Sequence, residues 1–374
     1  LDQVFAWAVV FESRIALIGR HHIADKSFNT RADLFGFLAV IITHRAILLD
    51  RRKTYPLPGV LPSLAGLIGR KVSNRMTAHK LHGGIDAGGT TFKCGLADRT
   101  GALIETRRIP VSTPDETISV CLDWVMAAAA NATLKSFGIA SFGPIDVDPQ
   151  SESYGTITGS AKPDWSGTNL RARFSETLGL PVTVDTDVNG ALLAEMRKGA
   201  ARGCASAAYV TVGTGIGAGL YANGGFLGRP SHPEFGHIAL RRHRDDDTFE
   251  SVCPFHPDCL EGLASARAIR ARAGDPEALA PDHPVWDIAA DYLAQAARAL
   301  TLTFRPERII FGGGLLLAPH LIARIRAAFD KQMGGYLEHA PSSRLIATPG
   351  LGDDAGLIGA ILLGQSGPAP FNGL

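Results

Sequence analysis

The sequence is short of cysteine, of net charge and of long apolar runs. Its five cysteines are an odd number, which argues against a secreted disulfide framework. The formal net charge of +1 gives no general field that attracts nucleic acid or acidic lipid. The apolar segment at residues 34–49 is interrupted by His44 and Arg45 and falls short of the ~20 apolar residues that span a bilayer. These absences favour a cytoplasmic protein with no membrane or nucleic-acid partner.

The stretch before the first regular pattern, residues 1–81, is expected to be an N-terminal extension. It lacks a basic segment followed by a small-residue cleavage site, so a signal peptide is poorly supported. The chain opens with Leu1, and Met76 stands just before the first strong strand signal. We therefore hypothesise that residues 1–75 lie upstream of the functional protein, which starts near Met76.

Two similar hairpins divide the remaining chain into halves. GGIDAGGTTFKCGLAD (83–98) and AAYVTVGTGIGAGLYA (207–222) each combine a strand, a Gly/Thr turn and a returning strand, and mixed strands and helices follow both. This order predicts a duplicated α/β domain around a cleft. The glycines lie between two strands and do not follow GxGxxG, which argues against a Rossmann fold.

The hairpin turns are typical of phosphate-binding loops. Glycine lets backbone N–H groups approach a phosphate closely, and threonine hydroxyls add donors. Asp86 can hold Mg²⁺ through water, and Lys93 can add positive charge. Ordinary tight turns would use the same residues, but two such turns and a glycine triplet favour nucleotide binding. The candidate nucleotide-binding residues are Asp86, Gly88, Gly89, Thr90, Thr91, Lys93, Thr211, Gly213, Thr214, Gly215, Gly217, Gly312, Gly313 and Gly314.

A polar corner follows in VDTDVNGALLAE (184–195), where a strand meets a helix. Phosphoryl transfer to a sugar hydroxyl needs a base within hydrogen-bond reach of that hydroxyl. We expect Asp187 to be this base and Asn189 to orient the sugar. The alternative is that Asp185 or Asp187 caps the following helix.

A cluster of sulfur and nitrogen ligands is predicted around CPFHPDCLEG (253–262). Cys253, His256 and Cys259 follow the spacing C-x2-H-x2-C, and His237 supplies a distant fourth ligand, which together suit tetrahedral zinc. One alternative is a disulfide between the two cysteines, which a reducing cytoplasm would not preserve. The other is that His256 is an ordinary surface residue.

Taken together, DAGGTTFK, DTDVNGA, GTGIGAG, HPEFGH, CPFHPDCLEG and FGGG resemble the ROK family of sugar kinases and related repressors, and more closely its fructokinase branch. The resemblance runs from about His82 to Gly364. It implies an actin-like (ribonuclease H-like) two-lobed ATPase fold with a zinc knuckle. The implied lobes are residues 82–190 and 191–374, with a final helix at about 352–366 packing back on the first lobe. It also implies ATP and a sugar as substrates, Mg²⁺, a structural Zn²⁺ and a homodimer.

The resemblance also implies roles for single residues. The family's base falls on Asp187, its sugar contacts fall on Asn189, Glu234, His237 and Glu261, and the fructokinase branch carries a lysine where this chain has Lys162. The segment here is GSAKPDW, whereas STPKPGW is expected, so this sequence departs from the branch around the lysine. The resemblance favours phosphorylation of the 6-hydroxyl of D-fructose.

Two other functions remain open at this point. One is a ROK kinase for glucose, mannose or N-acetylmannosamine, because one sequence does not display the hydroxyl contacts that select a hexose. The other is a sugar-responsive repressor with a helix-turn-helix in residues 1–75. That stretch lacks a basic recognition helix, and the presence of Asp187 and both glycine hairpins favours catalysis.

Overall fold

The computed structural model describes residues 79–159, 162 and 164–367. The chain divides into two units after Met76, and all described residues belong to the second, Thr77–Leu374. Residues 1–78 of the expected extension (1–81), the expected start of the functional protein at Met76 and the helix-turn-helix alternative lie outside the described residues. The last three residues of the expected extension, 79–81, belong to the first strand. No helix within the described ranges has the length and apolarity needed to cross a bilayer.

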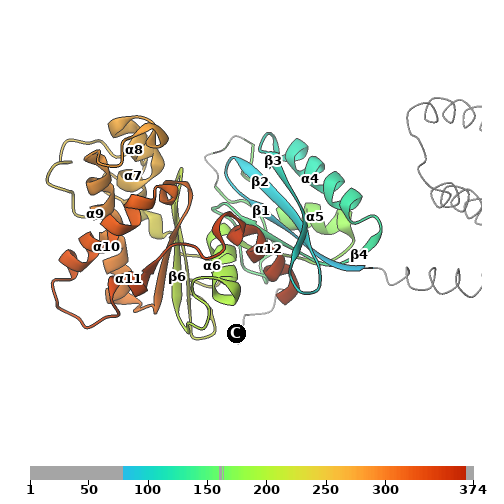
Figure 1. Ribbon diagram of the computed structural model, residues 1–374. Helices are drawn as coiled ribbons and strands as arrows, with labels where there is room; N and C mark the ends of the chain where they lie inside the picture. The colour runs from blue at the N-terminus through green and yellow to red at the C-terminus, as the bar shows by residue number, and fades with distance from the viewer. Residues whose placement is uncertain (1–78, 160–161, 163, 368–374) are drawn as a thin grey trace, which may run out of the picture. The chain divides into compact units, whose positions relative to one another are not determined.

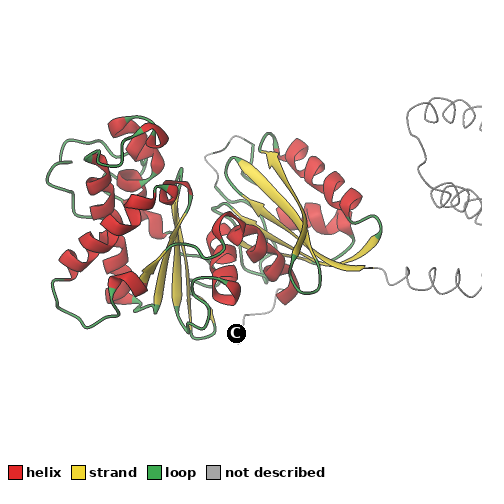
Figure 2. Ribbon diagram, in the orientation of Figure 1, coloured by secondary structure: helices red, strands yellow, loops and turns green. Residues whose placement is uncertain are grey.

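The first sheet has the strand order β3-β2-β1-β4-β5 (Figures 1 and 2). Strands β1, β2 and β3 form an antiparallel meander, and β4 and β5 run parallel to β1. Helix α4 begins where Thr113 caps its first turn, and α5 ends at Gly179 in a left-handed conformation. The bounds are β1 His79–Ala87, β2 Thr91–Ala97, β3 Leu103–Pro110, α4 Pro114–Ala128, β4 Ala132–Ser141, α5 Leu170–Leu178 and β5 Val182–Thr186.

The second sheet has the order β10-β9-β6-β7-β8. It repeats the first: β6, β7 and β8 form an antiparallel meander, and β9 and β10 add parallel to β6. The predicted duplication of one α/β domain is therefore confirmed. The bounds are β6 Ala207–Val212, β7 Ile216–Ala222, β8 Gly225–Phe226, η1 Phe235–His237, α7 Leu260–Ala264, α8 Ala266–Ala273, η2 Pro276–Ala278, α9 Val285–Thr303, β9 Arg308–Gly312, η3 Gly314–Leu317, α10 Pro319–Met333, α11 Ser342–Leu345 and β10 Ile346–Ala347.

Two helices, α6 (Asp187–Lys198) and α12 (Ala355–Ser366), lie between the two sheets (Figure 1). Helix α12 follows the turn η4 (Gly352–Asp354), packs on β1 and β4, and crosses α6, which itself contacts β6 and β7. The crossing is close because small residues meet there. A side-chain carbon on Gly359 would stand 1.9 Å from the Gly190 carbonyl oxygen. This contact places the start of α6 directly beside the start of α12.

Candidate functional site

A cavity of about 690 Å³ opens where the two sheets and the crossing helices meet. It is lined by residues from both halves of the chain, such as Asp86 and Gly312, which are more than two hundred positions apart in the sequence. Of the predicted site residues, it brings together Asp86, Gly88, Asp187, Thr211, Gly312, Gly313 and Gly314. Leu316, Leu317, Pro319 and Ile322 give the cavity an apolar part of its wall.

Asp187 is the first residue of α6 and faces this cavity. The helix cap is Thr186, whose hydroxyl accepts a hydrogen bond from the backbone N–H of Asn189 at 3.2 Å. The cap is therefore neither acid of the corner, although Asp187 Oδ1 accepts a hydrogen bond from the backbone N–H of Val188 at 2.8 Å. The Asp187 carboxyl still lines the cavity. Burial, and then the negative charge of Asp86, raise the pKa of the Asp187 carboxyl to about 7.

Asp86 is the second acid of the cavity, on β1. Burial raises its pKa to about 6, while the charge of Lys93 acts in the opposite direction. Two carboxyl groups with raised pKa values in one cavity are costly to ionise together, and a divalent cation removes that cost. Mg²⁺ suits such a place because it binds through one or two carboxylates and keeps several waters. The donor set thus fits the expected magnesium.

Lys93 does not supply free charge to the cavity. Its side chain is buried, and its Nζ lies 2.5 Å from Asp354 Oδ1 and 3.0 Å from Asp353 Oδ2, both in η4. The charge of Lys93 is therefore matched by these acids, and its predicted contribution at the phosphates stays a prediction. Lys162 lies beside the glycine turn of the same hairpin: a side-chain carbon on Gly89 would stand 3.8 Å from Lys162 Nζ.

Asn189 lies outside the cavity lining, in the interior below it. It is 1% exposed, and its Nδ2 donates a hydrogen bond to Asp185 Oδ1 at 2.8 Å. Asp185 in turn is buried and ion-paired with Arg229. Within the described ranges, the Oδ1 of Asn189 has no hydrogen-bond partner. The structure thus pairs the amide of Asn189 with Asp185.

The predicted sugar contacts lie away from this cavity. Glu234 is exposed at the start of η1, with its Oε1 3.4 Å from His232 Nδ1. Both oxygens of Glu261 are engaged, since Oε2 accepts from the backbone N–H of Ile216 at 3.0 Å and Oε1 from Arg267 at 3.0 Å. Glu261 therefore supports the tip of the second glycine hairpin. The remaining hairpin residues, which do not line the cavity, are Gly89, Thr90, Thr91, Gly213, Thr214, Gly215 and Gly217.

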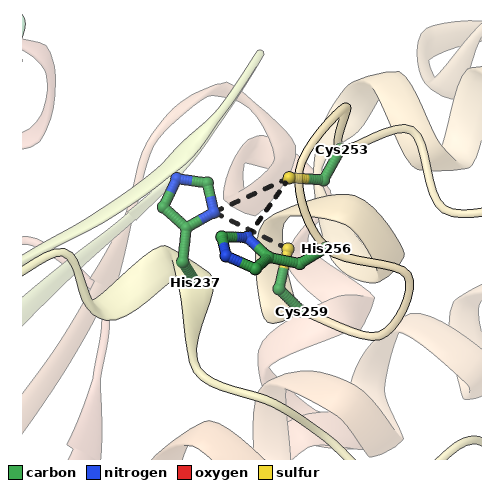
Figure 3. A group of neighbouring side chains, drawn as sticks. All are labelled: His237, Cys253, His256 and Cys259. Atoms are coloured by element: carbon green, nitrogen blue, oxygen red, sulfur yellow. Dashed lines mark hydrogen bonds between the residues drawn. The ribbon is translucent and has the colours of Figure 1, made fainter.

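The four predicted metal ligands come together (Figure 3). Their ligand atoms all lie within 4.8 Å of one another. The Nδ1 of His237 is 3.8 Å from Cys253 Sγ and 3.7 Å from Cys259 Sγ, and the Nδ1 of His256 is 3.7 Å from Cys253 Sγ. Tetrahedral zinc with ordinary Zn–N and Zn–S bonds needs N···S separations of about 3.6 Å. The set therefore fits zinc, and the second ring nitrogen of His237 points away from the sulfurs.

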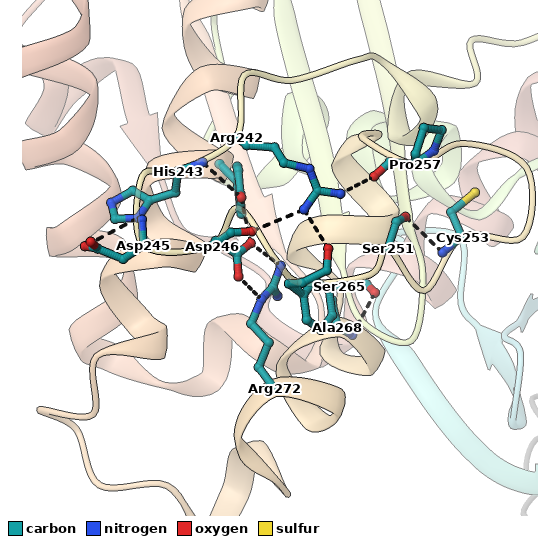
Figure 4. A network of polar contacts seen from close by, with 12 residues as sticks. Arg242, His243, Asp245, Asp246, Ser251, Cys253, Pro257, Ser265, Ala268 and Arg272 are labelled. Carbon is teal, nitrogen blue, oxygen red and sulfur yellow. Dashed lines mark hydrogen bonds and ion pairs between the residues drawn. The ribbon is translucent and has the colours of Figure 1, made fainter.

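A polar network holds the loop that carries Cys253 and His256 (Figure 4). Asp246 and Arg272 form a buried two-bond ion pair at 2.8 Å, and the Tyr292 hydroxyl donates to the same carboxylate at 2.7 Å. Arg242 spans the loop by donating to three carbonyl oxygens, those of Asp246, Phe249 and Pro257. The contacts of Arg242, Asp246 and Arg272 involve none of the predicted metal ligands, so the loop has an anchor of its own beside any bound metal.

Sequence reasoning missed several cavity residues, among them Tyr209 and Asp353. Tyr209 lies on β6, two positions before Thr211 and on the same face of the strand, and it lines the cavity. Side chains alternate between the two faces of a strand, so Tyr209 could have been predicted from AAYVTVG as a residue on the same face as Thr211.

Two repeated sheets with crossing helices between them, and a glycine-lined cavity where they meet, define the actin-like ATPase fold. The model of the ROK family matches residues 82–366. A fructokinase from Zymomonas mobilis is 41% identical, with 76% of this chain and 96% of the relative covered, and a fructokinase from Lactococcus lactis is 41% identical, with 69% and 87% covered. The crystal structure of a ROK family glucokinase from Streptomyces griseus in complex with glucose and AMPPNP superposes with a TM-score of 0.62 at 26% identity, covering 77% of this chain and all of that one. The chain belongs to the ROK family, as its motifs predicted.

Proposed function

We propose that this protein is an ATP-dependent fructokinase that phosphorylates the 6-hydroxyl of D-fructose. The observation that carries the proposal is the position of Asp187, a carboxylate at a helix start that faces a cavity lined by glycines from both halves of the chain. Fructose is favoured over glucose because the curated fructokinases are 38–41% identical to this chain, whereas the curated glucokinases are 27–30% identical.

In the proposed reaction, Asp187 accepts the proton of the attacking sugar hydroxyl. A base works best when its pKa lies near the working pH, and a value of about 7 meets this condition. The backbone N–H groups at Gly88 and at the triplet Gly312, Gly313 and Gly314 bind the phosphates, and Asp86 holds the magnesium through water. Magnesium, when bound, neutralises charge on the transferring phosphoryl group.

The apolar wall of the cavity gives a place for the adenine ring. Leu317 is 84% exposed, which is unusual for a leucine that lines a concave surface beside Leu316 and Ile322. A planar base stacked there would cover this side chain. This arrangement puts the phosphates toward the glycines and toward Asp187.

The metal cluster is proposed to serve the sugar end of the site. His237 offers Nδ1 to zinc, which fixes the tautomer so that the other ring nitrogen carries the proton and can donate to a sugar hydroxyl. The same knuckle leads directly into α7, whose Glu261 supports the second glycine hairpin. Zinc is thus expected to be structural, with an indirect effect on substrate binding.

The test is an ADP-release assay with fructose, glucose and mannose at equal concentrations. We expect kcat/KM for fructose to exceed that for either aldose by at least tenfold, because a site built for one hydroxyl pattern rejects others strongly. Phosphate must also appear on carbon 6 of the product, as determined by NMR. A preference for glucose or mannose would reject the proposed substrate and leave the kinase class intact, whereas no ADP release with any sugar would reject the kinase.

Activity should fall in acid with a midpoint near neutrality. The pKa of Asp187 is raised to about 7, so below that pH the carboxyl is protonated and cannot accept a proton. We expect kcat/KM for Mg·ATP, which reports the free enzyme, to fall about tenfold per pH unit below 7. At saturating Mg·ATP the midpoint should move to lower pH, because a cation beside Asp86 offsets its negative charge. A profile flat down to pH 5 would contradict this assignment.

A further inference from the structure

A tyrosine hydroxyl lies beside the first glycine of the strand-end triplet. Tyr209 is 6% exposed and lines the cavity. A side-chain carbon on Gly312 would stand 2.1 Å from the Tyr209 hydroxyl, so position 312 must be glycine for the phenol to fit. No described residue forms a hydrogen bond with this hydroxyl, and it is not among the fully buried unpartnered atoms, so it borders the cavity. A hydroxyl that is held on a buried ring, borders the cavity and has no protein acceptor is placed to donate a hydrogen bond to a ligand in that cavity.

The surroundings of the hydroxyl decide what it can do. Burial, and then the negative charges of Glu195, Asp86 and Asp187, raise the pKa of the Tyr209 phenol above its usual range. The phenol therefore stays protonated at any physiological pH and acts as a donor. The Tyr209 phenol can donate a hydrogen bond to an anionic ligand. The ionised carboxylates of the cavity can only accept hydrogen bonds.

The position of Tyr209 along β6 indicates which part of a bound nucleotide its hydroxyl contacts. Tyr209 and Thr211 point to the same face, and Thr211 pairs in register with Gly312. The proposed sugar contacts Glu234 and His237 do not line this cavity. We propose that Tyr209 donates a hydrogen bond to the phosphate chain of the bound magnesium–nucleotide, an inference that rests on the proposed kinase function.

Tyr209→Phe removes only the hydroxyl and leaves the ring in place. The chain offers a matched control in Tyr221 on β7, which is 1% exposed and whose hydroxyl, buried among the described residues, also has no partner but does not line the cavity. Calorimetric titration should show Tyr209→Phe binding Mg·AMPPNP about tenfold more weakly than wild type, the usual effect of one hydrogen bond to a charged group. Binding of AMP, which lacks the terminal phosphates, and the KM for fructose should change less than twofold. Tyr221→Phe should leave all three quantities unchanged.

Four outcomes would overturn the inference. The first is unchanged Mg·AMPPNP affinity in Tyr209→Phe, and the second is an equal loss for AMP, which would place the contact at the nucleoside. The third is a raised KM for fructose alone, which would place the hydroxyl at the sugar. The fourth is a similar loss in Tyr221→Phe, which would indicate a general packing effect. If the wild type binds Mg·AMPPNP but phosphorylates no sugar, the proposed function fails while the titration still decides the role of Tyr209.

Discussion

Replacing Asp187 by Asn should reduce kcat for fructose about a thousandfold, within the 10²–10⁴ range attributed to a positioned base. The amide has nearly the same shape, so fructose and Mg·ATP should still bind within about threefold of wild type. The measurement is kcat from ADP release together with fructose affinity from calorimetry. Undiminished turnover in Asp187→Asn would end the assignment of the base.

The same variant should not lose stability. The pKa of Asp187 is raised in the folded protein, so its ionised form costs folding free energy, and this cost grows as the pH rises from about 4 to about 7. Asparagine avoids that cost, and the thermal midpoint at pH 8 should stay equal or rise. Asp185→Asn makes the identical chemical change two residues earlier, at an acid paired with Arg229. It should lower the midpoint instead, because breaking a buried ion pair leaves an unpaired charge. A destabilised Asp187→Asn would indicate a structural role.

Replacing Cys253 by Ala should release the metal, lower the thermal midpoint by about 10 °C and raise the KM for fructose. The cysteine lies within 3.8 Å of two histidine Nδ1 atoms, so its loss removes one of four ligands. We take the stability linked to metal binding as ~4 kcal/mol. Each kcal/mol lowers the thermal midpoint by ~2–4 °C in a domain of this size, which gives a fall of about 10 °C. Fructose affinity should fall because His237 loses its fixed orientation.

Cys204→Ala provides the control, since Cys204 is a half-buried cysteine outside the cluster. It should retain one zinc per chain, measured by atomic emission, and wild-type kinetics. Full zinc content in Cys253→Ala would reject the metal site. A zinc-free Cys253→Ala with the wild-type KM for fructose would reject the coupling between metal and sugar and leave the metal site standing.

Local signals predicted much of this protein because their causes are local. Glycines between alternating apolar residues specify tight hairpins, and both hairpins lie where the pattern put them, around residues 88 and 213. The short spacing from Cys253 to Cys259 allows three ligands to face one point, whatever the rest of the fold does. The strand-to-helix corner at Asp187 follows equally from its own neighbours.

Residues whose partners are distant in sequence behaved differently. Lys93 was expected at the phosphates, but Asp353 and Asp354, some 260 positions away, match its charge. Asn189 was predicted to orient the sugar; its amide donates to Asp185, four residues earlier, and Asp185 is itself ion-paired with the distant Arg229. Each of these outcomes depends on which element packs where, and no periodicity in the sequence states that.

The sequence by itself determined the duplicated α/β architecture, the glycine turns, the acid at the helix start and the cluster of four candidate metal ligands, because spacing and residue type suffice for each. Only the tertiary structure decided which polar groups face the cavity and which are neutralised, because that depends on the crossing of α6 and α12. Burial of a charge or hydroxyl is set by the whole fold, so the raised pKa values of Asp86 and Asp187 and the unused donor of Tyr209 emerged only there.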